Sequence, residues 1–159
     1  MPLIEMYERP GFLLRRAHQI SAAIFEGSCA ALGLTQAQYG ALTVLSLQPG
    51  IDQTRLAKAL AFDKVTVLRV VRGLEERGLI AREVSPNSRR QMAVRLTPAG
   101  IRLLKKAEGS VQEAYNRLMA PLDAPQREQF IALLQLLTDG LVDQARAAFV
   151  PVSREPSTD

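Results

Sequence analysis

The chain contains few of the residues from which disulfides, metal centres and catalytic sites are built. Cys29 is its only cysteine and His18 its only histidine among 159 residues. A single cysteine excludes an intrachain disulfide and a cysteine-rich zinc site. The sequence also has no glycine-rich phosphate loop and no pair of nucleophile and base. We therefore expect no enzyme, no catalytic residue, no metal site and no cofactor.

Long apolar runs are missing as well. No stretch approaches the roughly 20 apolar residues needed to cross a bilayer. The opening segment MPLIEMYERP carries two acids and has no apolar core of signal-peptide length. The sequence therefore predicts a cytoplasmic protein without a membrane partner.

What the chain does contain is apolar and slightly basic. Hydrophobic residues make up 47% of it, which allows a sizeable core and argues against disorder. The 20 lysines and arginines exceed the 16 acids, giving a net charge of +4. An excess of this size permits an acidic partner such as DNA without requiring one.

Apolar spacing and capping residues predict two helices in the first third of the chain. Leu13, Ala17, Ile20 and Ile24 recur at spacings of three and four, which indicates a helix over residues 10–32. Gly33 ends that helix. Thr35 is placed to cap a second one, which reaches about Leu47 before the turn at Pro49-Gly50.

Two shorter helices are expected next. Asp52 is placed to cap one over residues 53–60, and Asp63 to cap another over residues 64–77, which Gly78 ends. The short connection between them has the length that a helix-turn-helix needs.

The chain then changes character. Met92, Val94 and Leu96 alternate as in a half-buried strand, which indicates a hairpin over residues 79–97 with a basic tip at residues 86–90. Thr97 and Pro98 start a long helix that runs to about Met119. Prolines bracket a break, and a leucine-rich helix over residues 126–149 follows.

Two short helices followed by a basic-tipped hairpin are the order of a winged helix-turn-helix. The segments LTQAQYGALTVL, QTRLAKAL, DKVTVLRVVRGLEERGLIAR and RRQMAVRLTPAG resemble the MarR family over residues 34–104. The most specific part is LEERGLIAR followed by RLTPAG. The resemblance implies a mainly α fold with a small β-hairpin wing and flanking dimerisation helices. Its expected parts are an N-terminal dimerisation helix (residues 1–33), a DNA-binding domain (34–100), C-terminal dimerisation helices (101–150) and a flexible tail (151–159).

The sequence departs from the family at the wing. The family usually has an acidic residue two positions before an arginine at the wing tip, whereas here Ser88 precedes Arg90. A salt bridge that organises the wing is therefore expected to be missing, which leaves the wing either more mobile or oriented by other contacts.

The helix over residues 64–77 has the features of a recognition helix. Val67, Val70, Val71 and Leu74 form its core face, which leaves basic and small side chains to read bases in the major groove. The start of the preceding helix and the wing tip are suited to phosphates or the minor groove. The expected DNA-binding residues are Gln53, Thr54, Arg55, Lys64, Val65, Thr66, Leu68, Arg69, Arg72, Arg89 and Arg90.

Self-association and a ligand are also implied. Apolar residues spread over more than one face of the last helix, so we expect a homodimer that presents two recognition helices to a palindromic operator. Family members often hold a small aromatic acid between the dimerisation helices and the winged domain. The expected contacts here are Arg16, His18 and Tyr39, and the opening run is similar to repressors of aromatic-acid or nicotinate catabolism.

Three alternatives remain open at this point. One is a repressor that responds to no ligand. Another is a redox sensor, although its family branch carries the reactive cysteine near Gly11 or Phe12, and Cys29 lies well beyond that position. The third is a winged-helix scaffold that does not bind DNA, against which the basic residues of the prospective DNA surface argue.

Overall fold

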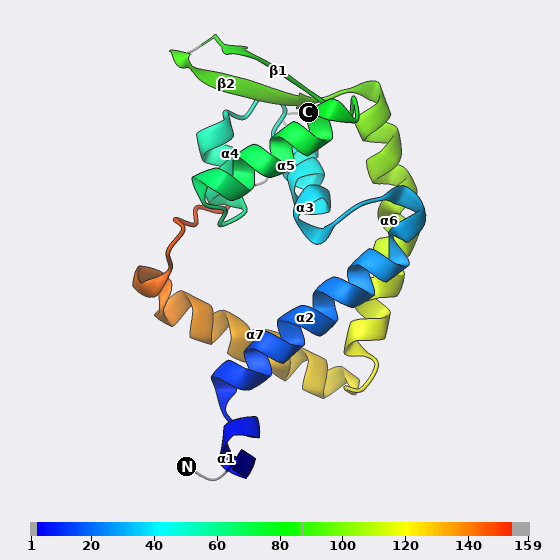
Figure 1. Cartoon of the computed structure of the whole chain (residues 1–159), viewed down its shortest axis with the longest axis vertical. Helices are drawn as coiled ribbons and strands as arrows, with labels where there is room; N and C mark the ends of the chain where they lie inside the picture. The colour runs from blue at the N-terminus through cyan, green and yellow to red at the C-terminus, as the bar shows by residue number, and fades with distance from the viewer. Residues whose placement is uncertain (1–2, 87, 154–159) are drawn as a thin grey trace.

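The computed structural model describes residues 3–86 and 88–153 of the chain. It is mainly helical and carries one antiparallel hairpin, which confirms the fold class predicted from the sequence (Figure 1). The α-helices are α1 Leu3–Tyr7, α2 Pro10–Ser28, α3 Gln36–Leu47, α4 Gln53–Ala59, α5 Lys64–Glu76, α6 Pro98–Met119 and α7 Ala124–Gly140. The strands are β1 Ile80–Ser85 and β2 Ser88–Leu96, and the short 3-10 turns are Ala30–Leu32 and Val142–Gln144. Among the described helices, none is long and apolar enough to span a membrane.

The helix starts follow the predicted capping residues. The backbone N–H of Gln38 donates to the Thr35 hydroxyl at 3.2 Å, and that of Arg55 donates to the Asp52 carboxylate at 2.8 Å. Thr97 accepts from Gly100 in the same way at 3.1 Å. Each cap satisfies a donor that the first helical turn leaves without an intrahelical partner.

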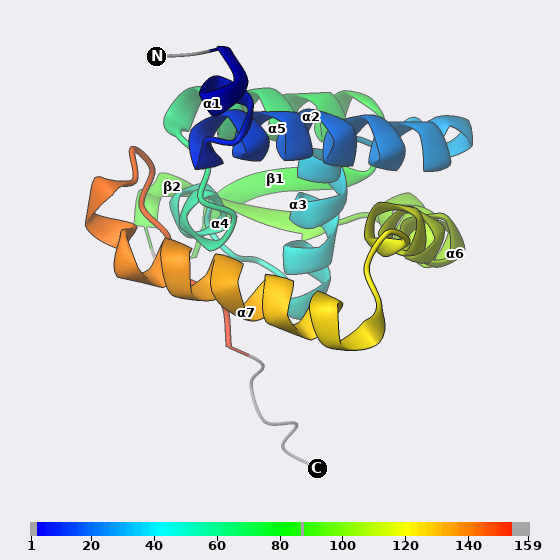
Figure 2. The ribbon, with the colours of Figure 1, turned by 90° about the horizontal axis from the view of Figure 1, so that it is seen from below.

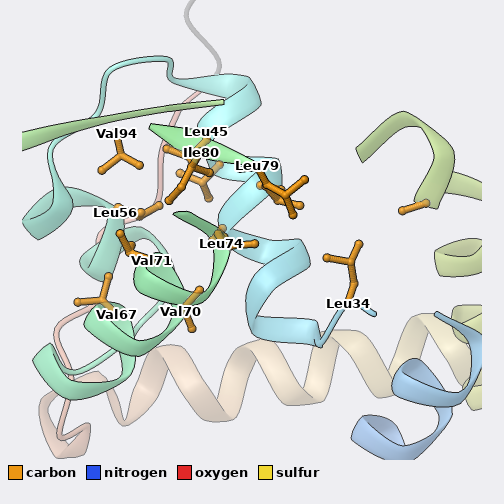
Figure 3. Close-up of a cluster of buried hydrophobic side chains, with 14 of the residues drawn as sticks. Leu34, Leu45, Leu56, Val67, Val70, Val71, Leu74, Leu79, Ile80 and Val94 are labelled. Carbon is orange, nitrogen blue, oxygen red and sulfur yellow. The ribbon is translucent and has the colours of Figure 1, made fainter. Parts of the chain in front are cut away.

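The core lies between α3, α4, α5 and the base of the hairpin. Leu45, Leu56, Val71, Leu74 and Val94 are almost completely buried there, and Figure 3 shows these side chains converging from the helices and from β2. Helix α6 meets this unit closely, because a Cβ on Gly100 would overlap the backbone carbonyl oxygen of Leu79. Only glycine allows that approach.

The hairpin is tied to the helix-turn-helix by its own backbone. Ile80 pairs with Leu96 and Arg82 with Val94 in an antiparallel register. The N–H of Gly50 donates to the Val94 carbonyl at 3.0 Å, and the N–H of Val94 donates to Ile51 at 2.9 Å. Gly50 has a φ of 81°, a left-handed conformation that favours glycine. The residues before α4 thus extend the edge of the wing.

The terminal helices stand apart from this core. Helix α2 packs along α6, whereas α7 crosses the other side of the molecule, so that α2 and α7 form separate layers (Figure 2). Helix α7 has no buried residue. Helix α1, which precedes α2, was not predicted.

The end of the chain differs from expectation. A helix over residues 126–149 was expected, but α7 ends at Gly140 and an extended segment follows the 3-10 turn. Glycine is a poor helix former, and the N–H of Val150 is bonded to the Lys58 carbonyl of α4 at 2.9 Å instead of within a helix. Residues 151–153, assigned to a flexible tail, lie against α4, and residues 154–159 of that tail lie outside the described residues.

Candidate nucleic-acid interface

Helix α5 has one buried face and one open face. Val67, Val70, Val71 and Leu74 are buried as the periodicity predicted, and Figure 3 shows them pointing into the core. On the opposite side Lys64, Leu68, Arg69 and Arg72 are exposed, and Val65 is exposed to 74%. Thr66 is half-buried. An exposed face that mixes arginine with aliphatic side chains can donate to guanine and contact thymine methyl groups.

The start of α5 is fixed by Asp63. Its carboxylate accepts from the backbone N–H of Thr66 at 2.7 Å. This hydrogen bond is the main reason why the pKa of Asp63 lies below its ordinary value, with a smaller contribution from the charge of Arg69. The acid is therefore ionised at neutral pH, where it holds the first turn of α5.

The expected phosphate contacts of α4 are only partly free. Thr54 and Arg55 are exposed at the start of the helix. Gln53 is half-buried, and its side-chain oxygen accepts from the Arg82 guanidinium at 3.5 Å. Gln53 thus links the helix-turn-helix to the wing in addition to lying beside the prospective DNA surface.

The wing is oriented by an ion pair that was not predicted from the sequence. The Arg82 guanidinium in β1 donates to both carboxylate oxygens of Glu75 in α5, each at 2.9 Å. That pairing lowers the pKa of Glu75 and raises the pKa of Arg82. Nothing in the spacing of the two residues indicates that they meet, because the hairpin must first fold back over α5. The base of the wing is therefore held without the acidic residue usual at its tip.

The wing tip takes a different form from the predicted one. Arg89 and Arg90 are exposed, but they belong to the first part of β2 and not to the connecting turn, of which Asn87 lies outside the described residues. Both lie where the register of the hairpin shifts, since Ser88 pairs with Ser85 and Met92 with Val84, so the regular alternation of a strand does not fix the directions of their side chains. The Ser88 hydroxyl accepts from the backbone N–H of Arg90 at 3.3 Å.

The expected ligand contacts are not brought together within one chain. Arg16 and His18 are both exposed on α2, but residues two apart lie on nearly opposite sides of a helix. His18 shares its side with Phe25, whose ring lies 5.8 Å from that of half-buried Tyr39. Arg16 lies on the side of exposed Ile20.

Cys29 has the environment of a structural thiol. It is completely buried, and loss of hydration on burial raises its pKa, to which the charge of Glu113 adds. A raised pKa disfavours the reactive thiolate. This geometry weighs against the redox-sensing alternative.

An N-capped helix with an open basic face, a short helix before it and a paired hairpin after it define a winged helix-turn-helix DNA-binding protein. The comparisons agree with this class. The family model described as MarR family matches residues 32–91. A protein of Thauera aromatica, described as a putative transcriptional regulatory protein for the hcr operon, is 35% identical over 128 residues, covering 80% of this chain and 77% of its own.

Two solved structures are similar over most of both chains. The repressor CouR bound to a 23-mer DNA duplex has a TM-score of 0.79 at 29% identity and covers 87% of this chain and 98% of its own. BpsR of Bordetella bronchiseptica, whose structure concerns regulation of DNA binding by 6-hydroxynicotinic acid, has a TM-score of 0.75 at 32% identity, with 81% and 98% covered.

The chain belongs to the MarR family of DNA-binding transcription regulators. This membership confirms the predicted family and the prediction that the chain is not an enzyme.

Proposed function

We propose that the protein is a cytoplasmic homodimeric repressor that binds a palindromic operator and is released by a small aromatic carboxylate. The main observation in favour of a dimer is the exposed apolar surface of the terminal helices. Leu13 and Ile20 of α2 are about half exposed, and α7 exposes a larger group. That group is Phe130, Ile131, Leu133, Leu136 and Leu137, and exposed Leu141 follows directly after the helix.

Exposed apolar side chains gathered on one helix are typical of an interface. In a two-fold dimer the same patch is used on both protomers, so the layers of α2 and α7 would be covered by those of a second copy. The symmetry would also present two α5 helices to successive major-groove faces, which suits a palindrome.

We assign the base contacts to α5 and the phosphate contacts, which position the protein on DNA, to α4 and β2. The exposed side chains of Val65, Leu68, Arg69 and Arg72 line one shallow depression, which gives them a common surface for base edges. Thr54, Arg55, Arg89 and Arg90 would hold phosphates. This division follows from exposure and charge.

The aromatic-acid effector is supported by the kind of regulator that the chain resembles, since BpsR is described as regulated by 6-hydroxynicotinic acid. His18 and Tyr39 lie toward the same side of α2 and would contact the ring. Arg16 lies on the side proposed to meet the partner protomer, where it would bind a carboxylate bidentately only if the site extends to the dimer interface.

The decisive experiment is a footprint on the DNA beside the protein's own gene, with and without 6-hydroxynicotinate or benzoate. We expect protection of two symmetric half-sites separated by about one helical turn or a multiple, and loss of protection with one of the acids. Protection of a single unpaired half-site would contradict the dimeric arrangement. Protection that no aromatic acid relieves would favour the ligand-independent repressor.

The contacts of the effector are tested by repeating the titration with Arg16→Ala, His18→Ala and Tyr39→Phe. Each substitution that removes a contact with the acid should raise the acid concentration needed to release the protein from DNA. The matched control is Gln19→Ala, at another exposed position of α2. If all three variants release at the wild-type concentration, the acid binds elsewhere.

A further inference from the structure

The last nine described residues form a strap between the proposed dimerisation helix α7 and the helix-turn-helix. This C-terminal strap, residues 145–153, runs from the end of α7 to α4, as both Figure 1 and Figure 2 show. The N–H of Val150 donates to the Lys58 carbonyl at 2.9 Å, and the Gln48 side chain donates to the Ser153 carbonyl at 3.3 Å. Val152 packs against the hydrophobic core.

These anchors give the strap a defined place. The Lys58 carbonyl lies in the last turn of α4, where backbone acceptors lack intrahelical partners. The same carbonyl also accepts from the N–H of Ala61, at the longer distance of 3.3 Å, and from the N–H of Leu60 at the end of the helix. The strap thus adds a hydrogen bond to an acceptor of α4 and covers part of the core at the same time, which limits its freedom.

The strap forms one wall of a cleft at the start of the recognition helix. The cleft has a volume of about 490 Å³ and lies between α4, α5 and the strap. Gln53 and Thr54 line it from α4, Lys64 and Leu68 from α5, and Arg146 from the strap. Four of these five residues, all except Arg146, are among the DNA-binding residues expected from the sequence.

The charge of the cleft favours an anion. Lys58, Lys64 and Arg146 are exposed cations of its lining. The acidic residue there, Asp63, already accepts from the backbone of α5. Arg146 is the only charged residue in the strap, whose remaining side chains are apolar or small. An arginine held by an apolar segment beside a DNA-binding helix has the position and chemistry of a phosphate contact.

We propose that Arg146 binds a DNA phosphate and that the strap delivers it to the recognition helix. The proposal rests on the DNA-facing surface assigned under the proposed function, and it adds an element from the far end of the chain. Because Arg146 lies in the cleft between α4 and α5 and does not line the depression on the open face of α5, it would strengthen binding without reading sequence.

The test is the salt dependence of binding to a mixed-sequence DNA duplex of about 30 base pairs, followed by fluorescence anisotropy between about 50 and 200 mM salt. Arg146→Ala should flatten the slope of log affinity against log salt by about 0.9 for each lost phosphate contact. Extrapolated to 1 M salt, that slope corresponds to a loss of about fivefold per contact at 0.15 M.

Three further variants fix the interpretation. Lys106→Ala removes a cation from an exposed position of α6 and should bind as wild type does. Val150→Pro with Val152→Asn removes the N–H donor and the apolar anchor while keeping Arg146, and should reproduce the loss. Lys64→Ala removes a cation of the cleft that does not belong to the strap.

The outcomes separate the two proposals. Wild-type slope and affinity for Arg146→Ala, with weaker binding by Lys64→Ala, would overturn the assignment of Arg146 alone. Unchanged binding by both would overturn the DNA-facing surface itself. Tighter binding by Arg146→Ala would show that the strap screens the DNA surface, and wild-type binding by the anchor variant would show that Arg146 acts without the strap. Each of these results contradicts the proposal.

Discussion

Helices α4 and α7 place their leucines in opposite environments. Leu56 of α4 is completely buried between α3, α5 and the wing, whereas Leu136 of α7 is 71% exposed. The same contrast holds for the two regions to which these helices belong. The winged domain buries a core of apolar residues within one chain, whereas α7 buries none of its own.

This difference shows which part of the structure contacts within one chain can determine. Burial of apolar surface drives folding, so the arrangement of α3, α4, α5 and the hairpin follows from their own side chains. The exposed leucines of α7 would gain the same stabilisation only against another surface. If that surface is a second copy, dimer formation and the position of α7 depend on the same contacts.

The largest effect is expected from breaking the proposed interface. Leu133→Glu with Leu136→Glu places two charges on the exposed face of α7, where burial against a partner would require desolvating them. Sedimentation should show monomers. Operator affinity should fall by more than a thousandfold, about 4 kcal/mol, because half of the specific contacts are lost.

The matched control is Glu128→Gln, at an exposed polar position of the same helix. It should remain dimeric and bind the operator normally. A double variant that still sediments as a dimer and binds with wild-type affinity would remove the contrast between the two regions.

The next effect belongs to the winged domain. Leu56→Ala should lower the free energy of unfolding by about 2–5 kcal/mol, because it opens a cavity in a fully buried site. Val65→Ala, on the exposed face of α5, should change it by less than about 0.5 kcal/mol. Both are measured by urea unfolding at one protomer concentration. Similar losses for the two variants would mean that this core does not carry the stability of the domain.

The sequence was most informative where local rules decide the structure. The caps at Thr35, Asp52 and Asp63 and the buried valines of α5 were predictable, because a cap and an apolar face depend on neighbours in the chain. The pair of Glu75 and Arg82 was not, since it depends on how the hairpin packs on α5. The strap was missed for the same reason, as its anchors on Gln48 and Lys58 lie far away in the sequence.

A smaller effect should separate reading from positioning within the winged domain. Arg69→Ala should cost about 1–3 kcal/mol at particular base pairs, as loss of a bidentate contact to guanine would. The measurement is the ratio of affinities for the operator and for a scrambled duplex. Arg55→Ala, at the start of α4, should weaken both duplexes alike. An unchanged ratio for Arg69→Ala would mean that base reading belongs to other residues of α5.

The smallest effect concerns the ion pair that holds the wing. The hydrogen bonds from Arg82 keep the pKa of Glu75 below its ordinary value of 4.5, so the folded protein favours the ionised acid more than the unfolded chain does. The resulting stabilisation is present above the ordinary pKa and is lost as the pH falls through the lower value of the folded state. Because Glu75 is more than a third exposed, solvent screens the pair and the gain is small.

The difference in urea midpoint between wild type and Glu75→Gln should therefore stay constant from pH 7 to about 5 and shrink below about 4.5. Glu83→Gln breaks the more exposed pair with Arg95 and should cost less at neutral pH. If the difference for Glu75→Gln instead grew as the pH fell, the acid would not be stabilised in its ionised form, and the wing would have to be held by its backbone bonds to residues 50–52.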